Sequence, residues 1–285
     1  MIEILQRSYN PHSDTTLTTL VAEYPRIIHA EMLTHRMLSR NSASSRAIPS
    51  LSMTELVTKN PFIPEQWFAN GKGMSPSELL DEETAKKCEK IWMELIEFTV
   101  AKVKELTEHK LHKSYANRPL EPYSYIKVII SGTEWYNFFE LRCNRPAQEE
   151  FIKLANAIKE AQENYTPITL KKDQWHLPFI RSAENSNGVM EYYDNTGNRL
   201  SLDEAKIISA SCCAQISYRK EDSTIEKARS IFKQLIESDP RHASPVEYQA
   251  TPIVDTSYDG ITHIDKYGNK WSGNLKGWLQ WRQLL

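Results

Sequence analysis

The chain has 285 residues, of which 40% are hydrophobic, so it can form one large domain or two small ones around a buried core. Lysine and arginine number 35 and aspartate and glutamate 37, which gives a formal net charge of −2. This balance excludes a field strong enough to hold a nucleic-acid backbone, so we expect no polymeric nucleic acid as a partner.

Cysteine spacing argues against a disulfide or zinc site, and hydropathy argues against a membrane span or a signal peptide. The four cysteines show no Cys-x-x-Cys spacing, and the adjacent pair Cys212-Cys213 is poorly placed for a disulfide or a shared zinc ion, so we expect thiols and no metal site. No apolar run reaches the length of a membrane span, and the polar start, Met1 to Ser13, lacks a signal-peptide core. We therefore expect a cytoplasmic protein with no membrane partner.

A predicted strand and helix lead into a segment rich in hydrogen-bond donors. Leu17 to Ala22 favours a strand, and apolar residues from Ile27 to Leu33 fit one helix face. Residues 34–46 then hold three arginines, a histidine and four serines. Because closely spaced hydroxyl groups compete for backbone hydrogen bonds, we predict a helical turn ending near Leu38 and then a polar loop. The segment is either a solvated loop or a site for an anionic, planar ligand.

The next predicted elements are a proline-rich loop and a long helix. Residues 47–76 indicate an ordered loop with short turns. Ser75, Pro76 and Glu78 are typical of a helix start, with a serine cap, a proline at the first helical position and a glutamate three residues after the cap. Apolar residues then recur at helical spacing, which predicts an amphipathic helix to about His109.

Residues 1–165 are expected to form the core. Their last part contains a strand at Tyr125 to Ile130, a helix at Glu134 to Arg142 and a further helix that has Pro146 in its first turn. Residues 166–200 are polar and rich in turn signals, which predicts a linker or flap. Residues 201–285 contain an amphipathic helix and end in a tryptophan-rich tail, but 1–285 is expected to form a single domain.

The pattern in residues 34–46 resembles the signature of the flavin-dependent thymidylate synthases, Arg-His-Arg-x-x-Ser-x-Asn-x-x-Ser-x-Arg. The matching positions are His35, Arg36, Ser39, Asn41, Ser44 and Arg46. Only the first position departs, since it is Thr34. Six fixed positions in thirteen residues favour a ligand site over a solvated loop.

Two further blocks resemble the same family. Asn137, Leu141-Arg142 and Ala147-Gln148 are similar to its second signature, although Arg142 alone would also fit a helix-end arginine paired with Glu140. His242-x-Ser244-Pro245-x-Glu247 is similar to the family's Gly-His-x-Ser-Pro-Phe-Glu-His, which precedes the Arg-His-Arg block in most members. The chain therefore resembles a circularly permuted, divergent member, with the permuted segment in 201–285.

The resemblance implies an α/β fold with one mixed sheet and long amphipathic helices packed on it. It implies reductive methylation of dUMP to dTMP, with methylenetetrahydrofolate as one-carbon donor, FAD as cofactor and NADPH as reductant. It also implies a homotetramer in which each site contains residues from several subunits.

The resemblance also implies roles for individual residues. The catalytic residues would be Arg142, His242 and Ser44, and Arg142 would stabilise negative charge that develops on the pyrimidine ring. Cofactor-binding residues would be Thr34, His35, Arg36, Ser131, Asn137, Ser244 and Glu247. Residues that bind the nucleotide would be Glu31, Ser42, Ser44, Ser45, Arg46, Arg118 and Arg142.

Several positions depart from the family pattern. They are Thr34, Glu31 in place of a usual nucleotide-binding glutamine, Ser131 and Thr133 in place of an asparagine and an arginine that contact FAD, Pro146, and Tyr248. Losing a charge-assisted contact to a pyrophosphate costs about 1.5 to 3 kcal/mol. FAD would thus bind more weakly or be held by other arginines, such as Arg40, Arg241 or Arg282.

These departures leave two alternatives open. One is a related enzyme that hydroxymethylates dUMP or dCMP, and the other is a non-catalytic paralogue that binds a nucleotide or flavin. The cluster of Trp271, Trp278 and Trp281 is expected in the core or a subunit interface, with a cover for folate or nicotinamide as the alternative.

Overall fold

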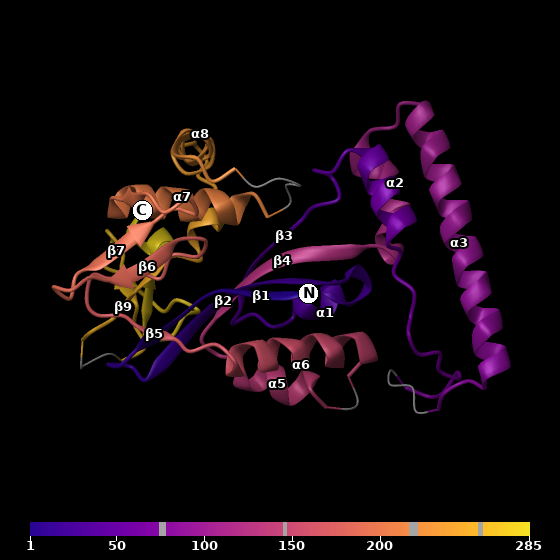
Figure 1. Ribbon diagram of the computed structural model, residues 1–285, viewed down its shortest axis with the longest axis horizontal. Coiled ribbons are helices and arrows are strands. Elements are labelled where there is room, and N and C mark those ends of the chain that lie inside the picture. The colour runs from indigo at the N-terminus through magenta and orange to yellow at the C-terminus, as the bar shows by residue number, and fades with distance from the viewer. Residues whose placement is uncertain (74–77, 145–146, 217–221, 256–258) are drawn as a thin grey trace.

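A five-stranded sheet forms the centre of the computed structural model, which describes all residues except 74–77, 145–146, 217–221 and 256–258 (Figure 1). The strand order is β3-β4-β2-β1-β5. The strands are β1 (Ile2–Asn10), β2 (Thr15–Pro25), β3 (Ser39–Ser42), β4 (Tyr125–Gly132) and β5 (Ile168–Thr169). Neighbours are antiparallel except β1 and β5, which pair parallel, so the mixed sheet of the expected α/β class is confirmed.

β2 and β4 are buried on both faces, which explains their continuous apolar sequences. Successive side chains alternate between the faces of a strand. Leu20 and Ile130 pack in the hydrophobic cluster on one face, while Val21 and Ile129 pack in another on the opposite face.

β1 was not predicted from the sequence, and β3 corrects a prediction. The polar start of the chain is a strand, because β1 pairs along most of β2 and Asn10, fully buried, donates from Nδ2 to the carbonyl oxygen of Gly277 at 2.8 Å. Ser39 to Ser42, predicted to be loop, form β3, because β4 supplies the backbone partners that local propensity does not provide.

Each face of the sheet is covered by helices (Figure 1). One layer contains α5 (Tyr136–Arg142) and α6 (Glu149–Glu163), whose Phe138, Phe151 and Ile158 pack onto β2 and β4. The predicted helix position of Pro146 lies outside the described residues. Short η1 (Arg26–Ile28) and α1 (His29–Met32) connect β2 to the donor-rich segment.

The other layer contains α7 (Leu202–Ala214) and α8 (Ile225–Leu235). Cys213 of α7 packs with Val21 and Ile129 of the sheet. Residues 166–200 contain β5 and a small antiparallel sheet of β6 (Arg181–Glu184), β7 (Met190–Tyr193) and β8 (Arg199–Leu200). Tyr192 of this small sheet packs against Ala205 and Ile208 of α7, which attaches it to the second layer.

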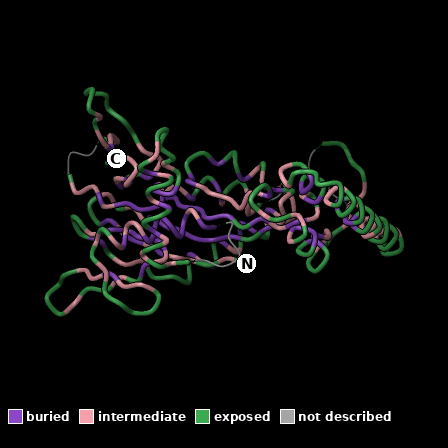
Figure 2. Tube along the Cα trace, turned by 90° about the horizontal axis from the view of Figure 1, so that it is seen from above, coloured by how far each residue is buried: buried purple, intermediate pink, exposed green. Residues whose placement is uncertain are grey.

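A helical arm stands beside the sheet. It consists of α2 (Ser50–Lys59), α3 (Glu82–Glu108), α4 (Lys113–Ala116) and η2 (Arg118–Tyr123). Met53 and Val57 of α2 pack against Ile96 and Val103 of α3. Figure 2 shows buried residues concentrated along the strands, whereas the long helix at the right of the view is mostly exposed.

The helices of the arm differ from the sequence-based prediction in two places. Residues 50–59, expected to be loop, form α2 because Met53 and Val57 lie one turn apart and are buried by α3. The predicted end of α3 near His109 is confirmed, but its start at Ser75 is wrong. The helix begins after Asp81, whose Oδ1 accepts a hydrogen bond from the Thr84 amide at 2.9 Å. Ser75 and Pro76 themselves lie outside the described residues.

The C-terminal part returns to the sheet, and its three tryptophans lie in different environments. It contains η3 (Ser244–Val246), β9 (Ala250–Pro252), β10 (His263–Ile264), β11 (Lys270–Trp271), β12 (Trp278–Gln280) and η4 (Trp281–Leu284). Trp278 is fully buried beside Leu17, and Trp281 stacks on Phe232 with ring centroids 5.4 Å apart. Trp271 is 51% exposed. Among the described residues, no helix is both long and apolar enough to cross a membrane.

Candidate functional site

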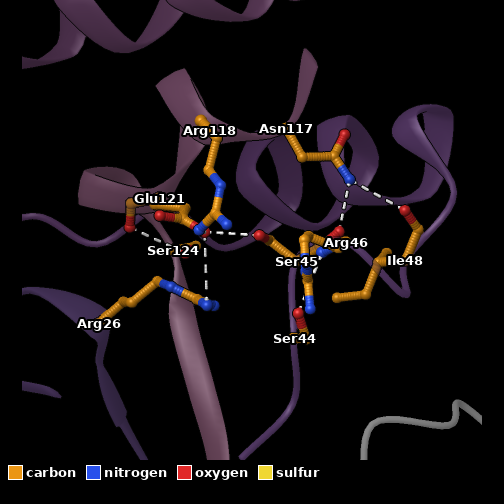
Figure 3. Close-up of polar contacts among 9 residues, drawn as sticks. All are labelled: Arg26, Ser44, Ser45, Arg46, Ile48, Asn117, Arg118, Glu121 and Ser124. Atoms are coloured by element: carbon orange, nitrogen blue, oxygen red, sulfur yellow. Dashed lines mark hydrogen bonds and ion pairs between the residues drawn. The ribbon is translucent and has the colours of Figure 1, made fainter. Parts of the chain in front are cut away.

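Four of the predicted nucleotide-binding residues, Ser44, Ser45, Arg46 and Arg118, lie together where the chain leaves β3 (Figure 3). Ser45 Oγ donates to Glu121 Oε1 at 2.5 Å, and Arg118 Nη1 donates to the same oxygen at 2.9 Å. Ser45 is 1% exposed, whereas Arg46 and Arg118 are exposed. The buried hydroxyl therefore fixes the backbone, and the two guanidinium groups are accessible.

Asn117 holds this loop through its side-chain amide (Figure 3). Its side chain is fully buried, and Nδ2 donates to the carbonyl oxygens of Ser45 at 2.8 Å and Ile48 at 2.9 Å. Arg26 Nη2 lies 3.4 Å from Glu121 Oε1, so one carboxylate has two arginine partners. This excess of positive charge is suited to a phosphate group. Asn117 and Glu121 were not identified from the sequence, although both are close neighbours of Arg118 in the chain.

Arg142, at the end of α5, is held from three sides. Its Nη1 donates to Glu31 Oε2 at 2.8 Å, its Nε donates to His35 Nε2 at 3.0 Å, and its Cζ lies 4.4 Å from the centroid of the Phe151 ring. The partner of Arg142 is therefore Glu31 and not the neighbouring Glu140. The structure thus brings three predicted site residues into one cluster, and it adds Phe151, which was not among the predicted site residues.

His35 accepts the hydrogen bond from Arg142 because its ring is neutral. The side chain is 9% exposed and lies edge-on to Phe138, with ring centroids 5.0 Å apart. Burial, reinforced by the positive charges of Arg142 and Arg40, lowers the pKa of His35 from 6.5 to about 4. Near pH 7 Nε2 carries no proton, so it accepts from Arg142, and the ring adds no positive charge to the cluster.

This cluster opens into a cavity of about 300 Å³, called here the Arg142 cavity. Its lining includes Thr34, His35, Arg36, Asn137, Phe138 and Arg142. Four predicted cofactor-binding residues therefore share one cavity with the predicted catalytic arginine.

A second cavity of about 570 Å³, called here the arginine cavity, lies on the other side of residues 36–38. Arg36 and Leu38 line both cavities. The arginine cavity is also lined by Ser39, Arg40, Glu247, Trp271, Asn274 and Arg282. Glu247, about two hundred residues from Arg36 in the sequence, is thus brought beside the donor-rich segment.

Other predicted residues lie away from these two cavities. Ser131 is fully buried in β4, and its hydroxyl is hydrogen-bonded to Thr19 Oγ1, which also bonds His176 Nε2 at 2.8 Å. Burial lowers the pKa of His176 to about 3, so its ring is neutral in this buried chain. Ser42 ends β3 opposite Val128 and is partly buried.

His242 is exposed between α8 and η3, and Ser244 is exposed at the first position of η3. The backbone amide of His242 donates to the carbonyl oxygen of Leu235 at 2.7 Å. Glu247, the last residue of this motif, lines the arginine cavity together with Arg36 and Arg40.

The mixed sheet, its two helical layers and these arginine-lined cavities define an α/β protein with sites suited to anionic ligands. Residues 6–168 match the family model described as thymidylate synthase complementing protein. Since the match covers more than half of the chain, the protein belongs to this family, the flavin-dependent thymidylate synthases.

Comparison with individual proteins finds similar solved structures and no similar curated sequence. The chain is similar to the crystal structure of a UMP/dUMP methylase PolB from Streptomyces cacaoi bound with 5-Br UMP, with 13% sequence identity and a TM-score of 0.49. The similarity covers 57% of this chain and 88% of that chain. No curated protein matches the sequence.

Proposed function

We propose that the protein transfers a one-carbon unit to C5 of a pyrimidine deoxynucleotide, converting dUMP to dTMP with methylenetetrahydrofolate and NADPH. The observation that carries this proposal is the fixed guanidinium of Arg142 in the wall of the Arg142 cavity. Family membership supports the same reaction.

Arg142 would act electrostatically on the pyrimidine. When C5 attacks a one-carbon unit, negative charge shifts within the ring, and a positioned cation lowers the energy of that state. Contacts with Glu31, His35 and Phe151 fix the guanidinium before a ligand binds, so little reorganisation is needed. The neutral ring of His35 holds Arg142 without opposing its charge.

The phosphate of the nucleotide would bind at Ser44, Arg46 and Arg118. This cluster lies where the chain leaves β3, whereas residues 36–38 and the Arg142 cavity precede that strand. The separation supports a site built from more than one subunit, in a homotetramer. His242 and Ser244, exposed in one subunit, would then reach the cofactor of another.

The residues present fit FAD in part. Arg36 and Arg40 offer guanidinium groups to a pyrophosphate, and Thr34, His35 and Asn137 line the adjoining cavity. Ser131 has its hydroxyl engaged inside the sheet and would support the site only through the position of β4. When bound and reduced by NADPH, the flavin would supply the hydride that reduces the transferred unit to a methyl group.

The permuted order of the motifs is part of this proposal. The family match ends at residue 168, yet Glu247 lines a cavity with Arg36 and Arg40. A segment from the third block thus lies beside the first block, as a permuted chain requires.

A second substrate, dCMP, is favoured by one observation. Glu31 is a carboxylate that only accepts hydrogen bonds, and it lies 2.8 Å from Arg142 Nη1. A pyrimidine bound against Arg142 would meet an acceptor there, which suits the amino group of cytosine better than the O4 carbonyl of uracil.

The test is anaerobic incubation of the purified protein with FAD, NADPH, methylenetetrahydrofolate and either dUMP or dCMP, followed by mass analysis of the nucleotide. Formation of dTMP supports the proposal, and a 5-hydroxymethyl product assigns the hydroxymethylase alternative. Nucleotide binding without any product would contradict both and indicate a non-catalytic paralogue. Arg142→Gln is the matched inactive control.

A further inference from the structure

A third cavity, of about 260 Å³ and called here the arm cavity, lies where the helical arm meets the sheet. Pro25, at the end of β2, and Tyr125, at the start of β4, line it from the sheet. Phe62 and Ile63 line it from the connection between α2 and α3, and Leu154 lines it from α6. Among the described residues, it shares no lining residue with the Arg142 cavity or the arginine cavity. It is therefore separate from the sites considered above.

Phe62 and Tyr125 form a fixed aromatic wall of the arm cavity. Their rings meet edge to face, with centroids 6.1 Å apart and an interplanar angle of 83°. Phe62 is 2% exposed, and its backbone amide donates to the carbonyl oxygen of Tyr123 at 2.9 Å. Its own carbonyl oxygen accepts from Trp92 Nε1 of α3 at 3.0 Å. The wall exists before a ligand binds, so it suits the ring of a small aromatic molecule.

Three carboxylate groups line the arm cavity, those of Glu23, Glu65 and Glu150. Among the described lining residues, the positive groups are Lys153 and the amino group of Met1. Lys153 pairs with Glu65, and the Met1 amino group donates to the backbone carbonyl oxygen of Glu23 at 3.2 Å. In the described part of the chain, the side chains of Glu23 and Glu150 have no hydrogen bond or ion pair. The cavity therefore favours a ligand with a positive charge.

The three glutamates also act on the hydroxyl group of Tyr125. The pKa of this phenol is raised from 10.0, first by burial and then by the negative charges of the three carboxylates, so it stays protonated. Within the described ranges, the hydroxyl group has no hydrogen-bond partner. Its oxygen can accept a hydrogen bond from an ammonium group, and the faces of aromatic rings attract cations.

We propose that the arm cavity binds a small aromatic primary amine. Glu23, Glu150 and the hydroxyl group of Tyr125 receive the ammonium group, and Phe62 and Leu154 pack against the ring. The volume of about 260 Å³ is slightly below the range of roughly 300 to 1,000 Å³ for drug-sized ligands, so the ligand has a single ring. Because one wall belongs to the arm and another to the sheet, the bound amine also restrains the arm. This inference does not depend on the reaction that the enzyme catalyses.

Isothermal titration calorimetry of the full chain with 2-phenylethylamine tests the site, with 2-phenylethanol and phenylacetate as the matched neutral and anionic ligands. The amine should bind about tenfold more tightly than the alcohol, and phenylacetate should not bind, because only the ammonium group complements the glutamates. Added salt should weaken binding of the amine and leave the alcohol unchanged. Saturating dUMP should leave the affinity for the amine unchanged, because the arm cavity is separate from the proposed nucleotide site.

Two variants test the position of the ligand. Glu150→Gln should weaken the amine several-fold, whereas Glu163→Gln, the matched control on the same helix but outside the cavity, should not. Ala157→Leu places a larger side chain in the cavity and should abolish binding, while the melting temperature stays near that of the unmodified chain because leucine is a good helix former. No binding of the amine, equal affinities for the three ligands, displacement of the amine by dUMP, or equal affinities in Glu150→Gln and Glu163→Gln would overturn the proposal.

Discussion

Arg142 combines charge with fixed geometry, and the two can be separated by mutation. Arg142→Lys keeps the charge, but an ammonium on a flexible stem cannot contact Glu31 and His35 as the planar guanidinium does. We expect turnover to fall about a hundredfold, the scale seen when one preorganised donor is lost. Steady-state kinetics with the proposed substrates measures the effect. Arg229→Lys, a surface arginine near Glu204, is the control, and equal turnover in both variants would show that charge alone suffices.

The lowered pKa of His35 predicts how the free energy of unfolding depends on pH. Burial and the neighbouring arginines lower its pKa from 6.5 to about 4 in the folded state, so the unfolded chain binds more protons between these values. The stabilisation is complete above about pH 6.5 and is lost as the pH falls toward 4. Urea unfolding of His35→Gln should show a weaker loss of stability over this range than the unmodified chain.

His176 adds to the same trend, because burial lowers its pKa to about 3. The double variant with His176→Gln should therefore lose more of the pH dependence than His35→Gln alone. Identical pH profiles for the unmodified chain and His35→Gln would contradict a neutral His35 in the folded state.

At the scale of single residues, the sequence identified side chains that could bind a ligand, but it did not show which of them contact one another. Arg142, His35 and Glu31 were predicted for three different roles, and the structure places them in one cluster. Spacing alone could not show this, because the three residues belong to different elements joined through the sheet. Phe151 was not among the predicted site residues, since a cation–π partner has no local sequence signal.

The loop after β3 depends on one side chain from another element, which gives a prediction at the element scale. Asn117 precedes η2 and holds the carbonyl oxygens of Ser45 and Ile48 while fully buried. Asn117→Ala should reduce the free energy of unfolding by about 1 to 3 kcal/mol, because these acceptors lose their donor. It should also weaken binding of the nucleotide phosphate.

Chemical denaturation and nucleotide titration measure both effects of Asn117→Ala. Asn164→Ala, at the end of α6, is the control for a lost asparagine side chain. Normal nucleotide affinity in a destabilised Asn117→Ala protein would show that the loop position does not affect the phosphate site.

Elements with strong local patterns were predictable, and elements stabilised by distant partners were not. β4 follows from a compact β-prone run, and the end of α3 follows from helical spacing of apolar residues. β1 and β3 are polar and form because β2 and β4 pair with them. α2 lacked a visible pattern within a proline-rich segment, because only Met53, Thr54 and Val57 are buried.

For the whole molecule, the cavities join segments that are far apart in the sequence. Arg36 and Arg40 come from the first fifty residues, whereas Glu247 and Arg282 come from the last fifty. The motif resemblance named both Arg36 and Glu247 as cofactor-binding residues, and both line the arginine cavity. The contribution of the tail had no signal in the sequence. Asn274 bonds Ser39, and Trp278 is buried against Leu17, so tail and sheet fold as neighbours.

The exposed face of α3 has an apolar row, which gives a prediction about subunit assembly. Ile91, Leu95 and Phe98 follow helical spacing and are 57%, 46% and 63% exposed on the arm that projects beside the sheet (Figure 1). Exposed apolar rows of this kind are typical of subunit interfaces. We therefore expect the proposed homotetramer to use this face.

Light scattering coupled to size-exclusion chromatography should give a tetramer mass for the unmodified chain and a smaller mass for the double variant Leu95→Glu, Phe98→Glu. Two carboxylates in an apolar interface would be desolvated without partners, which opposes association. Glu97→Lys changes a charge on the same helix outside this row and should keep the tetramer. A tetramer that persists in the double variant would place the interface on another face, and the nucleotide site would then have to be completed from there.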